Sequence, residues 1–93
     1  MTEYIDIRTE TTGDPDVMRL ITNLDLTAGG PPEVYESPEA GDHGSPLAQA
    51  LFAVPGLAAL TLTQQELLAT REPDTPWPDL LQDIYDVLRD FFL

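Results

Sequence analysis

The sequence contains no cysteine and no lysine, and only four arginines stand against 17 acidic residues in a chain of 93. Without cysteine there are no disulfides, no thiolate ligands for a metal ion or cluster, and no cysteine nucleophile. The formal net charge of −13 leaves no basic cluster for a phosphate backbone or an anionic membrane surface. We therefore expect neither nucleic acid nor a membrane as a partner.

Long apolar runs are also missing. No stretch approaches the roughly 20 apolar residues that a transmembrane helix needs. The first residues, MTEY, lack the basic start and apolar core of a signal peptide, so we expect a cytoplasmic protein. A length of 93 residues predicts a single domain over residues 1–93, with one thin core and little room for a deep pocket.

The most informative stretch covers residues 44–72. Ser45 can cap a helix, and Pro46 suits its first position, where the missing N–H costs nothing. The apolar residues that follow recur at the spacing of one helix face until a Pro-Gly pair ends the helix. Two strands, residues 57–63 and 67–71, are then predicted to form a hairpin.

Before this stretch the sequence predicts another hairpin and an irregular region. Residues 4–10 alternate apolar and polar side chains as a half-buried strand does, and residues 18–22 resume the strand pattern after the turn sequence TTGDPD. Residues 23–44 are rich in Gly, Pro and acidic side chains. We expect a solvated, mobile loop there, in which Val34 and Tyr35 can form a short edge strand.

The strongest helix prediction lies at the C-terminal end. Thr75 is the expected N-cap, and Pro76 and Pro78 fall in the first turn, where proline is tolerated. Seven apolar residues share one broad helix face: Trp77, Leu80, Leu81, Ile84, Leu88, Phe91 and Phe92. Opposite this face runs a narrow aspartate stripe, which consists of Asp79, Asp83, Asp86 and Asp90.

The predicted element order is therefore ββαββα. Both helices carry an apolar stripe, and the strands carry one apolar side. These patterns predict a two-layer α+β sandwich, with a mostly antiparallel four-stranded sheet and two helices on one face.

Two sequence motifs are shared with a known family. Residues 45–57, SPLAQALFAVPGL, match its pattern S-P-L-A-x-x-L-F-x-x-P-G-V. Residues 12–20, TGDPDVMRL, match its T-P-N-P-x-x-x-K-F loop more weakly, because a glycine, an aspartate and a leucine replace proline, asparagine and the aromatic residue. With Trp77 opening the last helix, nearly the whole chain resembles the N-terminal domain of Nfu/NifU-like iron–sulfur cluster scaffold proteins.

The resemblance implies a role without catalysis. In full-length family members a separate C-terminal domain holds the cluster on a Cys-x-x-Cys pair, and no cysteine is present here. The chain thus resembles a stand-alone version that carries no cofactor and acts as an accessory module for a protein partner, an iron–sulfur assembly factor or client. The alternative is an acidic protein-binding or regulatory domain with no link to iron–sulfur maturation. Neither interpretation predicts an oligomeric state.

Two surfaces supply candidate protein-binding residues. The first is the aspartate stripe, which would attract a basic partner, although a solvated helix face is the simpler interpretation. The second is the sheet face away from the helices. Arg8, Arg19 and Arg71 would gather there, with Tyr4 and Asp6, if the strand register permits.

Catalytic and metal sites receive little support. His43, beside Asp42 and near Glu39, has the ligand types for a divalent metal, but the glycine-rich loop fixes no geometry. Asp14 and Asp16 lack a partner for acid–base chemistry, and a turn in which Asp14 caps backbone N–H groups explains them better. We therefore predict no catalytic residue and no metal ligand.

Overall fold

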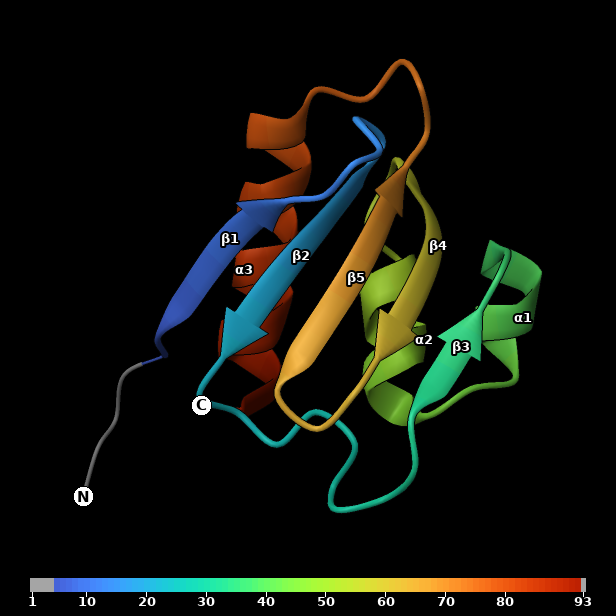
Figure 1. The fold of residues 1–93 in the computed structure, drawn as a ribbon. Coiled ribbons are helices and arrows are strands. Elements are labelled where there is room, and N and C mark those ends of the chain that lie inside the picture. Colours follow the sequence, from blue (N-terminus) through green and yellow to red (C-terminus); the bar gives the residue numbers. More distant parts are fainter. Residues whose placement is uncertain (1–4, 93) are drawn as a thin grey trace.

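Five antiparallel strands form one sheet in the computed structural model, which describes residues 5–92. In chain order the strands are β1 (Ile7–Thr11), β2 (Val17–Thr22), β3 (Glu33–Tyr35), β4 (Leu57–Leu62) and β5 (Glu66–Arg71). Their order across the sheet is β1-β2-β5-β4-β3, so β1 and β3 form the two edges (Figure 1). Tyr4, predicted to begin the first strand, lies outside the described residues.

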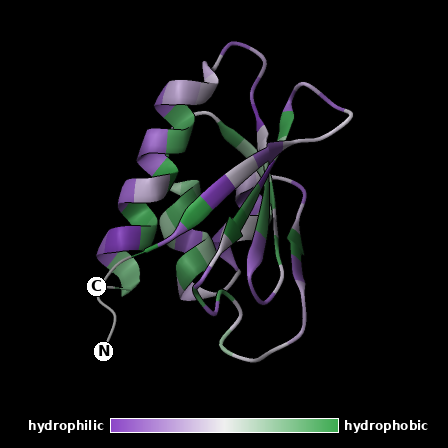
Figure 2. Ribbon diagram, turned by 60° about the vertical axis from the view of Figure 1, so that its left-hand side comes forward, coloured by the Kyte–Doolittle hydropathy of each residue, from purple (hydrophilic) through white to green (hydrophobic). Residues whose placement is uncertain are grey.

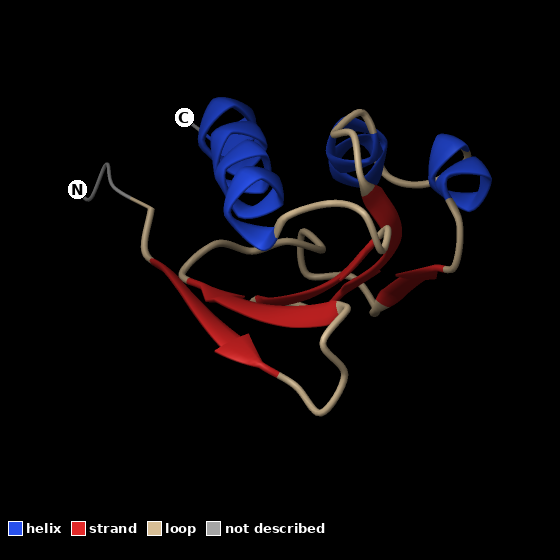
Figure 3. Cartoon of the chain, turned by 90° about the horizontal axis from the view of Figure 1, so that it is seen from above, coloured by secondary structure: helices blue, strands red, loops and turns tan. Residues whose placement is uncertain are grey.

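Three helices cover one face of this sheet. They are α1 (Pro38–Asp42), α2 (Pro46–Phe52) and α3 (Trp77–Phe92), and Figure 3 shows all three on the same side of the strands. The α+β class and the one-sided helix layer are confirmed. The count of four strands and two helices is wrong, and the element order is βββααββα.

The two additional elements, β3 and α1, lie where a mobile loop was expected. The short edge strand at Val34 and Tyr35 is confirmed, because β3 pairs with β4 in antiparallel register. Helix α1 begins with a Ser-Pro pair, as α2 does: the Ser37 hydroxyl accepts a hydrogen bond from the Ala40 N–H at 3.2 Å. Gly41 is the only buried residue of α1, so the sequence shows no apolar periodicity from which this helix could be predicted.

The predicted start of α2 is confirmed. The Ser45 hydroxyl accepts from the Ala48 N–H at 3.3 Å, and Pro46 takes the first helical position. The start of α3 differs from the prediction. This helix begins at Trp77, directly after Pro76, so Thr75 is not its N-cap and only the second of the two prolines lies inside it.

The core fills the space between the sheet and the helices. Its fully buried large side chains are Leu20, Leu51, Leu60, Leu62, Leu67, Leu80, Ile84 and Leu88. Hydrophobic and hydrophilic residues of α3 lie on opposite sides of the helix (Figure 2). Phe91 is an exception to the predicted apolar face, since 46% of its surface is exposed. Neighbouring helical residues point about 100° apart, and here Phe92 takes the core side.

Candidate functional site

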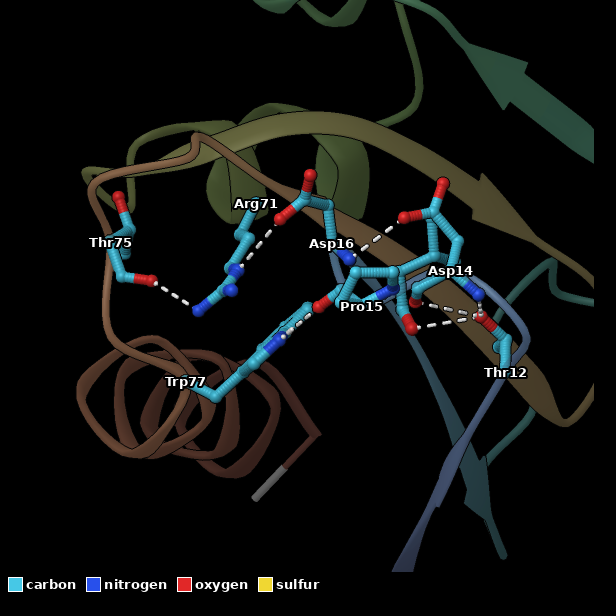
Figure 4. Close-up of polar contacts among 8 residues, drawn as sticks. Thr12, Asp14, Pro15, Asp16, Arg71, Thr75 and Trp77 are labelled. Carbon is cyan, nitrogen blue, oxygen red and sulfur yellow. Dashed lines mark hydrogen bonds and ion pairs between the residues drawn. The ribbon is translucent and has the colours of Figure 1, made fainter.

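The loop between β1 and β2 is a tightly hydrogen-bonded turn (Figure 4). A carboxylate oxygen of Asp14 accepts from the Asp16 N–H at 2.9 Å, and its carbonyl accepts from the Val17 N–H at 3.1 Å. The Thr12 hydroxyl accepts from the Asp14 N–H and donates toward the carbonyl oxygens of Asp14 and Val17, each at 3.1 Å. The Asx-type turn predicted at Asp14 is confirmed, and its carboxylate has a structural task.

Two side chains, one at the end of β5 and one at the start of α3, hold this loop in place. The Arg71 Nε donates to the Asp16 carboxylate at 3.1 Å, and Nη1 of the same side chain donates to the Thr75 carbonyl at 3.0 Å. The Trp77 indole N–H donates to the Pro15 carbonyl at 2.9 Å. The arginine guanidinium carbon lies 5.4 Å from the centre of the tryptophan ring, within range of a cation–π interaction.

We call these seven residues the Arg71–Trp77 cluster: Thr12, Asp14, Pro15, Asp16, Arg71, Thr75 and Trp77. The cluster joins the weaker sequence motif to the start of α3, across more than fifty residues of chain. Throughout residues 5–92, no buried side-chain nitrogen or oxygen lacks a hydrogen-bond partner. The contacts of the cluster are those of a structural clamp.

Arg71 does not lie on the open face of the sheet, contrary to the prediction. It alternates in phase with Leu67 and Ala69, which are fully buried beneath the helices. The sequence left this undecided, because Leu67 and Leu68 are both apolar and either one suits the core side.

Arg8 and Arg19 do lie on the open face, as the register of β1, β2 and β5 places them. Arg8 is opposite Ile21, and Arg19 is opposite both Glu10 and Leu68. The Arg19 guanidinium lies 3.6 Å from the Glu10 carboxylate and 3.7 Å from the Glu66 carboxylate. These neighbours offset its charge, so the predicted basic patch of three arginines does not form.

The aspartate stripe lies on α3 as predicted. Asp79, Asp83 and Asp90 are exposed. Asp86 is partly buried and accepts hydrogen bonds from Gln82 and Arg89, both at 3.1 Å. Three carboxylates of the stripe therefore face solvent, where they can meet a partner.

The candidate metal ligands around His43 lie at the surface. His43, Asp42 and Glu39 are exposed. In the part of the chain that the structure describes, no three His, Cys, Asp or Glu side chains are arranged to hold a metal ion. No helix in residues 5–92 has both the length and the apolar character needed to cross a membrane.

Sequence reasoning missed two apolar hollows beside Phe91. One, of about 300 Å³, lies between α2 and α3 and is lined by Ala50, Val87, Asp90 and Phe91. The other, of about 240 Å³, lies at the ends of these helices and includes Phe92. The sequence carries no local signal for them, because the apolar pattern of α3 continues to its last residues.

The comparison with known families is decisive. The family described as the N-terminal domain of the scaffold proteins Nfu and NifU matches residues 7–93. The chain belongs to this family. The resemblance that the two motifs indicated is thereby confirmed.

Relatives of this Nfu N-terminal domain include two iron–sulfur cluster scaffold proteins of flies. The mitochondrial NFU1 iron-sulfur cluster scaffold homolog of Drosophila grimshawi is 29% identical over 87 residues, which cover 92% of this chain and 28% of the relative. The same protein of Drosophila persimilis is 28% identical, and the match covers 92% of this chain and 30% of the relative. The chain thus spans less than a third of the length of these relatives.

Two solved structures share the fold. The solution structure of a NifU-like protein from Saccharomyces cerevisiae superposes with a TM-score of 0.77 at 23% identity, covering 96% of this chain and 79% of that one. The crystal structure of the protein SAV1430 from Staphylococcus aureus gives a TM-score of 0.70 at 17% identity, covering 88% and 96%. Both likenesses show that the fold of this chain occurs in solved structures.

The Arg71–Asp16 ion pair of this Nfu domain should contribute measurably to stability. We expect R71M and D16N to couple by about 0.5–1 kcal/mol in a double-mutant cycle, because the pair is partly shielded and geometrically fixed. The Arg71 side chain is 22% exposed, whereas that of Arg19 is 45% exposed with longer ion-pair distances. Urea unfolding should show the coupling and its decline in high salt.

R19M is the matched control for R71M. It removes the same charge from the neighbouring strand of the sheet and should change the free energy of unfolding by less than about 0.5 kcal/mol. Equal costs for the two arginine variants would contradict the assignment of Arg71 to a structural clamp.

Proposed function

We propose that this Nfu N-terminal domain is a non-catalytic protein-interaction module in iron–sulfur cluster assembly, which recognises an assembly factor or a client protein. One observation carries the proposal: the Nfu N-terminal family matches residues 7–93 of a sequence that contains no cysteine. Thiolates are the usual ligands of iron–sulfur clusters, so the domain has none to offer. A contribution to assembly must then come from its surfaces.

The arrangement of polar groups supports an interaction role. Arg71 and Trp77 donate hydrogen bonds within the domain, to Asp16 and Pro15. The candidate aspartates Asp79, Asp83 and Asp90 face solvent. The exposed carboxylates and the hollows beside Phe91 remain available to another protein. Exposed apolar surface with a polar rim is typical of protein-binding sites.

Reconstitution with iron and sulfide should leave the domain without a cluster. After anaerobic incubation with ferrous iron, sulfide and a thiol reductant, followed by desalting, we expect no bound iron and no visible charge-transfer absorbance. Colorimetric iron and sulfide assays check this result. Stoichiometric retention of both would contradict a purely accessory role.

Capture of partners in cells tests the proposal itself. The tagged domain, cross-linked in cells of its own source organism, should enrich iron–sulfur assembly proteins or cluster-free client proteins. The control bait is an unrelated domain of similar size and net charge, because a charge of −13 attracts basic proteins without specificity. Recovery of only those proteins that the control bait also binds would refute the proposal.

A second candidate function is an acidic protein-binding domain unrelated to iron–sulfur maturation. It is favoured by the aspartate stripe, whose members Asp79, Asp83 and Asp90 are exposed. The double reversal D79K/D83K should then abolish partner binding while the circular dichroism spectrum stays unchanged. An interaction that survives this reversal would remove the second candidate.

A further inference from the structure

Phe91 is an exposed aromatic residue between two apolar hollows. It contributes to the lining of both, with Ala50 and Val87 on one side and Leu26 and Leu47 among the residues on the other. Helices α2 and α3 lie side by side on the sheet (Figure 3). The two hollows adjoin at Phe91, which lines both of them. We call the surface of these hollows the Phe91 groove and define it by Leu26, Pro46, Leu47, Ala50, Val87, Phe91 and Phe92.

The rim of the groove is acidic. Within the described residues, every charged side chain that lines either hollow is a carboxylate: Asp25, Glu33 or Asp90. At 100° per residue, Asp83 lies one helical turn before Val87 on the same side of α3, so part of the aspartate stripe borders the groove. The other wall, α2, has the sequence PLAQALF and carries no charge.

The nearest cation on α3 is held away from the groove. The Arg89 guanidinium lies 5.6 Å from the centre of the Tyr85 ring and donates to the Asp86 carboxylate at 3.1 Å. Tyr85 lines a different hollow, between α3 and β1. The carboxylates around Phe91 are therefore not neutralised by this arginine. The groove combines an apolar surface with a negatively charged rim.

An apolar groove with an acidic rim favours one kind of binding partner. A second copy of the chain would bring its own acidic rim against this one, at a net charge of −13 per copy. An amphipathic helix with Lys or Arg beside its apolar stripe matches both features, because helices bind grooves through side chains at i, i+3, i+4 and i+7. We infer that the Phe91 groove docks a basic amphipathic helix of the partner protein, an inference that rests on the proposed interaction function.

A designed peptide tests the groove directly. The probe is a fluorescein-labelled peptide of about 14 residues, four helical turns, with leucines at helical spacing and lysines on both flanks. A scrambled peptide of the same composition controls for charge alone. We expect saturable binding of the first peptide to the full chain, and chemical-shift changes in the ¹⁵N-labelled domain confined to α2, the second half of α3 and residues 25–33.

Substitutions in the groove should weaken binding of the designed peptide. F91S should raise the dissociation constant roughly tenfold, as expected for an aromatic anchor in a small interface. V34S is the matched control, because Val34 is 64% exposed on the opposite face of the sheet and should not affect binding. D83N/D90N should reduce both the affinity and its salt dependence, whereas E72Q/D74N, with the same change of charge in the loop before α3, should leave both unchanged.

The outcomes separate this inference from the proposed function. Three results would overturn the docking inference. They are equal binding of the designed and scrambled peptides, shift changes centred on β1 or the Arg71–Trp77 cluster, and an unchanged affinity of the F91S variant. Concentration-dependent dimerisation that F91S abolishes would overturn it in favour of a second copy. If iron–sulfur proteins are captured and F91S does not reduce their recovery, the function stands and the groove fails. If the peptide binds the groove but no iron–sulfur proteins are captured, the docking inference stands and the proposed function fails.

Discussion

Replacing Trp77 with alanine is expected to lower the free energy of unfolding by about 2–3 kcal/mol. Truncation of a fully buried tryptophan typically costs about 3–5 kcal/mol, and Trp77 is only partly buried. The variant also loses the hydrogen bond to the Pro15 carbonyl and the ring beneath Arg71. Since Trp77 is the only tryptophan, urea unfolding should be followed by far-UV circular dichroism.

Two further variants show where this energy comes from. W77F keeps an aromatic ring but has no N–H donor, so it should cost about 1 kcal/mol, the usual value of one hydrogen bond. F91A removes an aromatic side chain that is 46% exposed and should cost less than W77A. Hydrogen exchange of the Asp16 and Val17 amides should accelerate in W77A. If W77A is no more costly than F91A, the cluster does not anchor the loop.

The sequence predicted elements that carry their own local signals. The Ser45-Pro46 start of α2 and the Asx turn at Asp14 follow from hydrogen bonds within a few residues, and both are present. The aspartate stripe follows from helical periodicity in the same way. Such features need no knowledge of the rest of the fold.

The errors arose where tertiary contacts decide. Three-residue β3 is held by its pairing with β4, and α1 is too short to show an apolar face. Arg71 was assigned to the wrong face because adjacent Leu67 and Leu68 made the alternation of β5 ambiguous. Phe91 was assigned to the core because the pattern is apolar to the end of the helix, whereas 46% of its surface is exposed beside the hollow between α2 and α3.

The same dependence on distant contacts makes Gly56 a sensitive position. Its φ of +94° lies in the region that favours glycine, and an added Cβ would lie 2.5 Å from the Thr75 side chain. Rotation of the Thr75 side chain would not remove the contact, because its Cβ would also lie only 3.0 Å away and its backbone carbonyl is held by the hydrogen bond from Arg71. We therefore expect G56A to cost about 2–4 kcal/mol, the sum of backbone strain and overpacking.

Two other glycines separate these two costs. Gly29 also has a positive φ, +79°, but open space where a Cβ would lie, so G29A should cost only the strain of about 1–2 kcal/mol. Gly13 has open space and no positive φ, so G13A should change stability by less than about 0.5 kcal/mol. Thermal and urea unfolding should rank the costs as G56A, then G29A, then G13A. If G56A lowers the free energy of unfolding no more than G29A does, Thr75 moves aside without cost. The α2–β4 turn is then not tightly packed against the Arg71–Trp77 cluster.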